Sequence, residues 1–552
     1  MINFREKYII YLRYVRFADL FCLKTKKGSV LVLKLPKFKG KEMFVSRVNR
    51  SAEIAKLTET VAESFGFYLD FYLGEDYEIK EQRDNGVYRY AALKNGTSAA
   101  FLNYFYLSNE LYIVCEENCN YFNFKDTCGE HHGQPQITQL SLLDYGMSYA
   151  IKLSDGRFIL IDGGNRFERD VDWLWKHLKS QSPTEKPVIA CWIMTHAHSD
   201  HFHAFIGMQD RYADEYVVQS FILNFMEIDD ERFPGADKTD PRFSYNTSNA
   251  VNIPLMFEKI KETGAPVFMA HTGQIYNIGD AKIEMLSGLD ETVDFMRANI
   301  NATSLVFKME LGGQIILWTG DATFSEARLP QRYGDYIKSD IMQVPHHGFE
   351  GPIDPKVELE GYVLNNAETC FLPVNKNNAY VAIDTYHVGP RYLFQYADVE
   401  VITGEDEKTI TLPYTPPAYR KLENRVNFRD GLAKSGATTW YFTGLNYENE
   451  EDVTFDILKT AGWVNASVGI QLIFFDKQKN LNMRISLKRG NHRINLADKE
   501  SGIFDGNWES WNSLKTKGLE ENGEFAVKFT SNIPIVISNK KHTAAYVNEL
   551  RV

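Results

Sequence analysis

The chain has 552 residues, too many for one hydrophobic core, and we expect about two to four domains. Its composition is that of an ordinary globular protein, and the formal net charge of −12 disfavours broad electrostatic binding to nucleic acid or to an anionic membrane. The sequence has no run of about 18 apolar residues, so we expect no membrane-spanning helix. Six cysteines without a recognisable signal peptide fit a reducing compartment, and the cytoplasm is the expected location.

Residues 1–133 are expected to form a small β-rich domain whose role the sequence does not indicate. Strand-like runs occur at Ser29–Lys34 and Leu111–Val114, and the stretch from Arg50 to Phe65 predicts a helix. The end of this region carries Cys115, Cys119, Cys128, His131 and His132. Because their spacing matches no usual zinc-ligand pattern, we interpret them as free thiols and surface histidines, with a structural zinc site as the alternative.

Residues 134–415 are expected to form the second and largest unit. A hairpin is predicted from Ser148–Leu153 and Phe158–Ile161, and its second strand ends in Asp162 followed by two glycines. An amphipathic helix is predicted from about Asp170 to Lys179, and a buried strand covers Val188–Met194. Each predicted strand therefore leads directly into a polar turn.

The turn after the buried strand reads Thr195-His196-Ala197-His198-Ser199-Asp200-His201, which groups three histidines and a carboxylate. Imidazole and carboxylate are the usual ligands of Zn²⁺ and similar divalent ions. Asp321 and the pair His346-His347 also follow predicted strands. Because packed strands hold the loops at their ends in a fixed geometry, these residues together predict a metal site.

The last part of the chain differs in texture from the second unit. Pro413, Pro416 and Pro417 mark a linker, and strand-like runs separated by turns follow. No metal-type cluster occurs in residues 424–552, and we interpret this segment as a β-sandwich accessory domain.

Taken in order, the motifs of the second unit resemble the metallo-β-lactamase superfamily, and most closely the hydrolase domain of ComEC-type competence proteins. The matching segments are Leu160 to Gly164, His196-x-His198-x-Asp200-His201, Asn299 to Val306, Thr319-Gly320-Asp321 and Val344 to Gly348. The resemblance covers about residues 136–413. It implies an α/β fold, namely the metallo-β-lactamase αβ/βα four-layer sandwich, which here would carry β-rich N-terminal and C-terminal accessory domains.

The resemblance also implies a site for two divalent metal ions, with Zn²⁺ expected and Mn²⁺ as the alternative. Carried over by position, its ligands are His196, His198, Asp200, His201, Asp321 and His346. The first two would hold one ion, the next two would hold the other, and Asp321 would bridge them. His346 would complete the ligands of the second ion, with His347 as the alternative for that position. Asp162 would orient ligand histidines through hydrogen bonds.

One departure from the superfamily concerns the first ion. Many members carry a further histidine before the Ser-Leu-Val segment, where this chain has Asn299 and Asn301. The first ion is therefore expected to be weakly held, to be absent, or to use His347. His203 and His271 are further candidates, although a position lining the cleft suits His203 better.

This site predicts a metal-dependent hydrolase that uses a metal-bound hydroxide, since paired ions lower the pKa of a shared water and polarise the scissile group. Asp200 would orient or deprotonate the nucleophile, and His347 would stabilise the oxyanion or protonate the leaving group. Tyr145, Asn299 and Asn301 could assist at the oxyanion. The expected substrate is a phosphodiester or other phosphate ester, because the ComEC-type subgroup resembles nucleases and phosphodiesterases.

Other functions stay open at this point. A small ester, lactone or lactam is the alternative substrate, and either a small molecule or a polymer fits. The absence of a spanning segment argues against a membrane partner, and net charge argues against nucleic acid. Diiron flavoprotein oxygen reductases share the fold, but they usually carry Glu where this chain has His198 and append a flavodoxin domain. A non-catalytic binding protein with a decayed site would explain Asn299 and Asn301.

Overall fold

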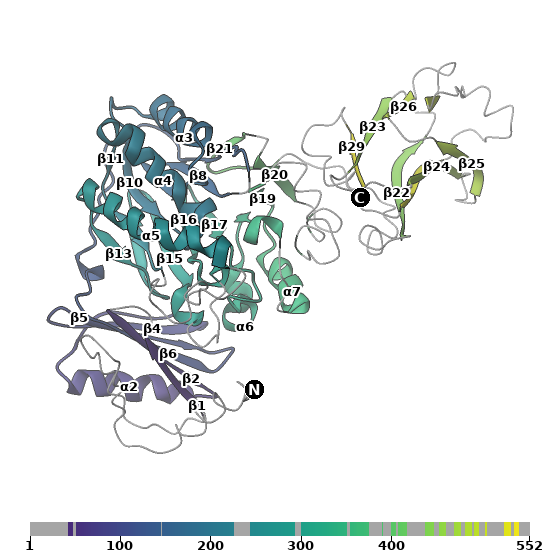
Figure 1. Cartoon of the computed structure of the whole chain (residues 1–552). Helices are drawn as coiled ribbons and strands as arrows, with labels where there is room; N and C mark the ends of the chain where they lie inside the picture. The colour runs from purple at the N-terminus through teal and green to yellow at the C-terminus, as the bar shows by residue number, and fades with distance from the viewer. Residues whose placement is uncertain are drawn as a thin grey trace, which may run out of the picture.

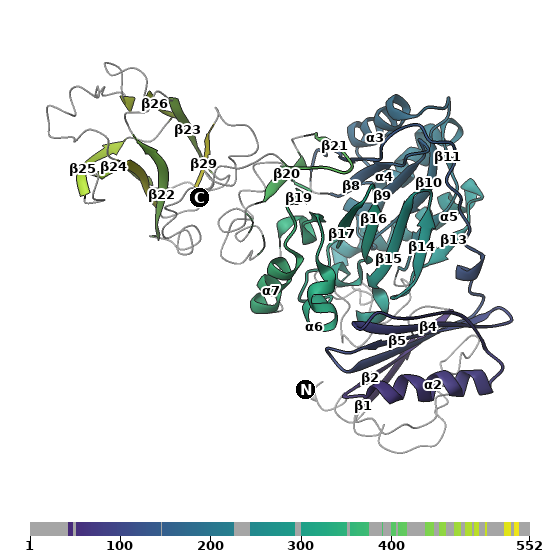
Figure 2. The ribbon, with the colours of Figure 1, turned by 180° about the vertical axis from the view of Figure 1, so that it is seen from behind.

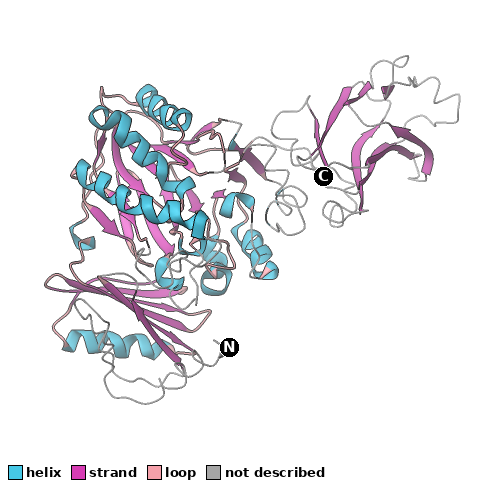
Figure 3. Ribbon diagram, viewed as in Figure 1, coloured by secondary structure: helices cyan, strands magenta, loops and turns pink. Residues whose placement is uncertain are grey.

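The structure is a computed structural model in which part of the chain is described. Side chains and backbone are described for residues 51–144, 146–225, 251–292, 300–349, 354–374, 389, 393, 399–404 and 407–416. Backbone alone is described for residues 42–47, 243–250 and the strands of the C-terminal region. These residues form a mixed α/β protein with five β-sheets, which confirms the expected α/β class (Figures 1 and 3). None of the helices in the described part of the chain is long and apolar enough to cross a membrane.

An antiparallel six-stranded sheet forms the N-terminal part, in the order β1-β2-β6-β5-β4-β3. Its strands are β1 (Glu42–Arg47), β2 (Ala52–Thr58), β3 (Glu78–Asp84), β4 (Tyr88–Asn95), β5 (Ser98–Phe105) and β6 (Glu110–Glu116). Helix α2 (Ala62–Gly74) covers one face of this sheet, and the other face is turned toward the rest of the chain (Figure 1). The sheet therefore has two buried faces.

The helix predicted from Arg50 to Phe65 is wrong over the first part of that stretch, because β2 occupies Ala52–Thr58 and the helix begins only at Ala62. Successive side chains of a strand point to opposite faces. In β2, Ile54 packs into the large central core, whereas Leu57 packs against α2. Burial of both faces removes the polar–apolar alternation that normally identifies a strand, and this is why the sequence pattern was misleading.

Two larger sheets form the central part of the molecule. The eight-stranded sheet contains β7 (Gln136–Gln139), β8 (Ser148–Lys152), β9 (Phe158–Asp162), β10 (Val188–Ile193), β11 (Val217–Val218), β12 (Phe221–Leu223), β13 (Val267–Met269) and β21 (Thr409–Thr411). The seven-stranded sheet contains β14 (Ile275–Ile278), β15 (Ala281–Ser287), β16 (Val306–Leu311), β17 (Gln314–Trp318), β18 (Ile341–Gln343), β19 (Thr369–Leu372) and β20 (Glu400–Thr403). Because β21 pairs with β7, the last of these strands returns to the first.

Helices cover the two central sheets. The α-helices are α3 (Glu168–Gln181), α4 (Ser199–Tyr212), α5 (Phe243–Thr263), α6 (Leu329–Tyr333) and α7 (Pro355–Asn365). The short 3-10 helices are η1 (Tyr121–Asn123), η2 (Ala213–Glu215), η3 (Leu289–Thr292), η4 (Asn301–Thr303), η5 (Gly334–Ile337) and η6 (Pro345–Gly348). Helices α3, α4 and α5 lie on one side of the sheets, and strands β15 and β16 face the viewer from the opposite side (Figures 1 and 2).

The C-terminal strands form two antiparallel four-stranded sheets, ordered β22-β28-β24-β25 and β27-β26-β23-β29. Their strands are β22 (Ala437–Asn446), β23 (Asp452–Lys459), β24 (Val468–Phe475), β25 (Leu481–Leu487), β26 (Asn491–Asn495), β27 (Ile503–Phe504), β28 (Glu524–Ser531) and β29 (Ile535–Asn539). The strand-like runs predicted in this region coincide with strands of these two sheets.

The N-terminal sheet packs against the turn that joins β13 to β14. Gly273 in this turn has a φ of +87°, and a Cβ atom there would lie 2.4 Å from Cδ2 of Tyr90 and 2.5 Å from Oδ1 of Asn103. The Asn103 amide also donates a hydrogen bond of 2.8 Å to the Thr272 carbonyl. Only glycine allows this close approach without strain.

His271, in the same turn, is a buried charge between the N-terminal and central sheets. Its Nδ1 lies 2.8 Å from Oδ2 of Asp290 in η3, and its Nε2 lies 3.5 Å from Oε2 of Glu116 in β6. Burial by itself lowers the pKa of His271, but the two carboxylates outweigh it and raise the pKa to about 10. The imidazolium therefore joins the two parts of the protein at neutral pH.

We expect this ion pair to make the stability of the fold depend on pH. The folded pKa of His271, about 10, exceeds the usual value near 6.5 of an unfolded chain, so its contribution is complete below about pH 6.5 and is lost as the pH rises through 10. The difference in Tm between the native chain and His271→Gln should be largest near pH 6.5 and should shrink toward pH 10. Thermal unfolding from pH 6 to 10 measures this, with His131→Gln as an exposed control. A difference in Tm that does not vary with pH would contradict the assignment.

Candidate metal centre

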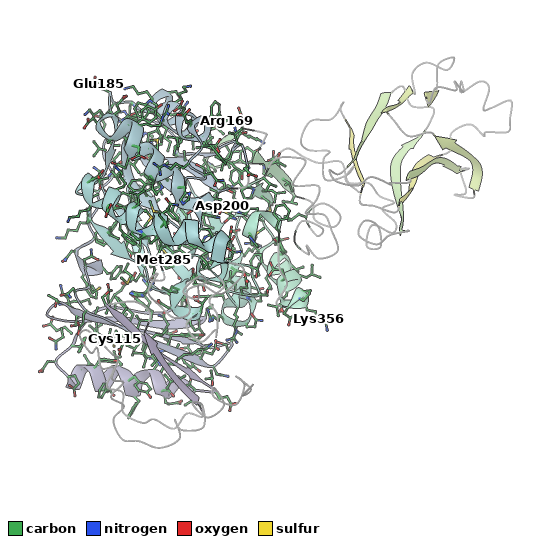
Figure 4. All side chains as sticks on the ribbon, in the orientation of Figure 1. Cys115, Arg169, Glu185, Asp200, Met285 and Lys356 are labelled. Atoms are coloured by element: carbon green, nitrogen blue, oxygen red, sulfur yellow. The ribbon has the colours of Figure 1, made fainter. Side chains whose placement is uncertain are left out.

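The ends of four strands from the two central sheets bring the metal-type residues together. In the eight-stranded sheet β9 ends at Asp162, and the loop after its parallel neighbour β10 carries the histidine motif. In the seven-stranded sheet the parallel pair β17 and β18 leads to Asp321 and to the turn at His346. Asp200, labelled in Figure 4, lies in the first turn of α4. Parallel strands deliver the residues at their carboxyl ends to the same edge of a sheet, and here two such edges meet.

One group of possible ligands consists of Asp200, His201, Asp321 and His347, whose ligand atoms all lie within 4.8 Å of one another. Nε2 of His201 is 3.2 Å from Oδ2 of Asp321. Nε2 of His347 is 3.2 Å from Oδ2 of Asp200 and 3.4 Å from Oδ1 of Asp321. The two imidazoles and two carboxylates thus face a common point.

A second group consists of His196, His198 and Asp321, also within 4.8 Å of one another. Nε2 of His196 lies 3.6 Å from Oδ2 of Asp321 and 3.0 Å from Nδ1 of His198. Asp321 therefore belongs to both groups.

The hydrogen bonding of these side chains fits a metal site. Nε2 of His201, Nε2 of His347 and Oδ1 of Asp321 are buried, and within the described part of the chain they make no hydrogen bond. Buried polar atoms without partners are costly, and a bound cation would satisfy all three. Imidazole nitrogen and carboxylate oxygen are also the donor set of Zn²⁺ and Mn²⁺ sites. The residues present therefore fit divalent metal ions.

The alternative zinc site near the end of the N-terminal region is not assembled. Among the described residues, groups of three or more His, Cys, Asp or Glu side chains able to share an ion occur only at the centre just described. Cys115 lies instead against Tyr72, with 3.0 Å between its Sγ and the tyrosine Oη, and Cys128 is an exposed free thiol. The interpretation of these cysteines as free thiols holds.

Asp162 holds residues of the centre in place through hydrogen bonds. Its Oδ1 accepts one hydrogen bond of 2.8 Å from the backbone N–H of Thr195. Its Oδ2 accepts two bonds of 2.8 Å, one from the Thr195 hydroxyl and one from Nδ1 of His201. The bond to Nδ1 leaves Nε2 of His201 to face Asp321. Thr195, whose hydroxyl is also 3.1 Å from Nδ1 of His196, was missed by the motif analysis although it directly precedes the motif.

We expect Asp162→Asn to weaken metal binding by about 10- to 100-fold, because the amide cannot hold the tautomer of His201 as the carboxylate does. Asp162 has a φ of +55°, a conformation that Asn tolerates, so the backbone should be retained. Competition between the protein and a coloured chelator measures the affinity. Asp155→Asn, a change in the turn before the same strand, serves as the control, and equal metal affinity in the two variants would count against this role of Asp162.

Burial and the nearby carboxylates shift the pKa values of the histidines of the centre in opposite directions. Burial lowers the pKa of His196 far below its usual value and that of His198 to about 4. Burial also opposes protonation of His347, but the nearby Asp321 and Asp200 raise its pKa to about 9. Burial raises the pKa of Asp321, and the surrounding imidazoles, led by His201, lower it by more. The carboxylates thus attract positive charge, which a metal ion would supply.

The turn η6 separates the roles of its two histidines. His346 and His347 have left-handed φ angles of 45° and 52°, and Gly348 continues the turn with a φ of 77°. This turn directs His347 inward, with its side chain 4% exposed, whereas that of His346 is 28% exposed. The ring of His346 lies 4.0 Å from Asp321 and accepts a 2.9 Å hydrogen bond from the Asn301 amide. Within the described residues, the group of four possible ligands contains His347, whereas His346, the residue expected there, belongs to neither group.

Gly320 allows the loop of Asp321 to reach the histidine motif. It has a φ of +53°, and a Cβ atom there would lie 2.9 Å from Cβ of Ser304 and 3.0 Å from Cβ of Thr195. The Ser304 hydroxyl then accepts a 3.0 Å hydrogen bond from the backbone N–H of Asp321. A glycine at this position therefore brings the two sheet edges into contact at the centre.

The remaining candidates lie elsewhere or outside the described residues. His203 lies in α4 and belongs to neither group, and its pKa is lowered to about 4 by burial and by the nearby Arg166. His271 belongs to the interface with the N-terminal sheet. Tyr145 and Asn299 lie outside the described residues.

Comparison with known proteins shows similarity to solved structures alone, since no family model and no curated protein sequence matches the chain. The metallo-β-lactamase fold protein YhfI from Bacillus subtilis is 14% identical, with a TM-score of 0.27 over 43% of this chain and 85% of its own. A metallo-β-lactamase from Cronobacter sakazakii with a HARLDQ motif is 14% identical, with a TM-score of 0.21 over 34% of this chain and 64% of its own. CmlA, a diiron β-hydroxylase from Streptomyces venezuelae, is 12% identical, with a TM-score of 0.25 over 44% of this chain and 45% of its own. This chain thus spans less than two thirds of the last two proteins, and at these scores similarity alone assigns no family.

Proposed function

We propose that this chain is a metal-dependent hydrolase of the metallo-β-lactamase superfamily that acts on phosphodiesters or other phosphate esters. The observation that carries the proposal is the pair of largely buried ligand groups sharing Asp321. Their donors come from three segments, the loop from His196 to His201, Asp321 and His347, in the chain order of the superfamily motifs. The proposal places the centre in the ComEC-type subgroup because of the Val344 to Gly348 segment.

In this proposal His196, His198 and Asp321 would hold one divalent ion, and Asp200, His201, Asp321 and His347 would hold the other. When bound, such ions supply a hydroxide nucleophile near neutral pH and polarise the substrate oxygen. Zn²⁺ suits the histidine-rich donors, and Mn²⁺ suits the carboxylates. The second group has one more donor than the first, so we expect its ion to bind more tightly.

The protein side chains would perform the remaining steps. Asp200, whose side chain is 20% exposed, is the carboxylate of the centre most accessible to solvent and can accept a proton from the attacking water. Asp321 is held by the centre and is only 2% exposed. Beside it, the Asn301 amide and the His346 ring form a polar pair that can bind an oxygen of the substrate. Asn301 thus keeps the oxyanion role that the sequence analysis gave it, and His346 takes the oxyanion role given there to His347.

The same proposal extends to the architecture. The two central sheets with their helices would form the αβ/βα four-layer sandwich within residues 134–415. Pairing of β21 with β7 supports this division, because it closes the unit at both ends. Residues 1–133 and 424–552 would be β-rich accessory domains, the second of them a β-sandwich built from the two C-terminal sheets. A small-molecule or polymeric ester is the proposed partner.

A metal-reconstitution assay tests the function. Protein stripped of metal with a chelator should be inactive, and adding Zn²⁺ or Mn²⁺ should restore hydrolysis of bis-p-nitrophenyl phosphate. Elemental analysis should find up to two ions per chain. A lactone and a chromogenic β-lactam are tested in parallel, and metal-dependent turnover of either one in place of the phosphodiester would replace the proposed substrate class. Absence of metal-dependent turnover on all three substrates would refute the hydrolase.

A further inference from the structure

A line of buried polar contacts runs from the N-terminal sheet to η3. Glu116 of β6 faces His271, and His271 in turn pairs with Asp290 at the distances given above. The next residue, Thr272, donates a 2.5 Å hydrogen bond from its hydroxyl to Glu291, which follows Asp290 in η3. Both carboxylates of η3 are therefore held by the turn on which the N-terminal sheet rests.

A second set of contacts reaches η3 and its surroundings from the same sheet. The guanidinium of Arg332 in α6 is fully buried and donates a 2.7 Å hydrogen bond to the hydroxyl of Tyr112 in β6. Arg332 also interacts electrostatically with Glu291. Arg328, nearby in the chain, pairs with Glu110 at the start of β6. Thus β6 contacts the central part through Glu110, Tyr112 and Glu116, which are spread along its length.

From η3 the contacts continue to the metal centre. Helices η3 and η4 pack against each other, and η4 begins with Asn301, whose amide donates to His346. The Asn301 carbonyl accepts a 2.7 Å hydrogen bond from the Ser304 hydroxyl, which also holds the backbone of Asp321. The backbone N–H of Leu305 donates to the Thr195 carbonyl at 2.9 Å. Residues 301–305 thus make three hydrogen-bonded contacts with residues of the centre or directly beside it.

The buried charged groups of this interface can all be paired in only one position of the N-terminal sheet relative to the central part. Burying His271, Asp290 and Glu116 is expensive, and an apolar interface of the same size would join the two parts equally well. Buried charges are satisfied in one geometry alone, so they specify register as well as contact. We propose that the N-terminal sheet is a positioning part of the active site, in which His271 fixes η3 and thereby the Asn301–His346 pair. His271 is a positioning residue in this proposal, which rests on the proposed hydrolase function.

Hydrogen exchange of the full-length protein tests, without an activity assay, whether the N-terminal sheet fixes η3 through His271. In His271→Gln, peptides covering residues 287–305 should exchange faster than in the native chain, whereas peptides covering β8 and β9 should be unchanged. Tyr121→Phe is the matched control, because it removes interface hydrogen bonds to Glu81 and Ile275 away from η3. Unchanged exchange in residues 287–305 would overturn the proposal. If His271→Gln does not fold, Glu116→Gln, which keeps the His271–Asp290 pair, takes its place with the same expected result.

A double-mutant cycle tests the link to catalysis. His271→Gln should lower kcat by about 3- to 30-fold with metal content unchanged, as for a residue that acts through others. Asn301→Ala should lower kcat as well, and the double variant should be no slower than Asn301→Ala, because both changes act on the same pair. Multiplicative losses would overturn the positioning role. A native protein without turnover would refute the hydrolase instead, and the exchange experiment would then still decide whether the sheet braces residues 287–305.

Discussion

Replacement of Asp321 by Asn should reduce metal-dependent kcat/KM by about 1,000-fold or more, which corresponds to several kcal/mol of transition-state stabilisation. Asp321 is the residue shared by both ligand groups, and its two oxygens face the imidazoles of His196, His201 and His347. Asn has the same shape, but it lacks the negative charge and presents N–H donors to nitrogens that must remain free for a metal. Both ions should therefore bind more weakly. Elemental analysis together with phosphodiester turnover measures the two effects.

Asp335→Asn is the matched control for Asp321→Asn, because it makes the same chemical change at an exposed position of η5. Circular dichroism confirms that both variants fold. Full metal content and native turnover in Asp321→Asn would remove Asp321 from the centre and would leave the two groups without a bridging ligand.

Replacement of His347 by Ala should remove one of the two ions and lower turnover by about 100-fold or more, as expected when several kcal/mol of metal-based stabilisation is lost. The reason is geometric, since Nε2 of His347 lies within 3.4 Å of both Asp200 and Asp321. His346→Ala should keep both ions and lower turnover by about tenfold, through loss of a hydrogen-bonding group near the substrate. Metal content of the purified variants measures the difference.

The two histidine variants control each other. Both positions have left-handed φ angles, 45° and 52°, and Ala carries a Cβ atom just as His does, so neither replacement adds backbone strain. A difference in metal content between the two variants therefore does not arise from a difference in backbone strain. Loss of an ion from His346→Ala, with both ions retained in His347→Ala, would restore the assignment that the sequence resemblance implied.

Local patterns were sufficient to identify much of the central part. Apolar runs ending in a polar turn predicted β9, β10, β17 and β18, and each of these strands is present. The residues that follow them carry metal-type side chains, and those after β10, β17 and β18 lie together in the two ligand groups. This succeeded because strand propensity, turn chemistry and ligand type are properties of a few adjacent residues. The prediction of a helix from Arg50 to Phe65 failed because β2 is buried on both faces. Its residues therefore do not alternate between polar and apolar, so no local pattern identified the strand.

By itself, the sequence determined the mixed α/β class, the strands that lead to the centre and the set of residues from which its ligands are drawn. The tertiary structure alone distinguished the positions of His346 and His347, because a left-handed turn points adjacent rings in different directions. It alone also revealed the buried ion pair between His271 and Glu116, which lie far apart in the chain. Contacts between distant segments depend on how the sheets pack, and no short pattern in the chain records that packing.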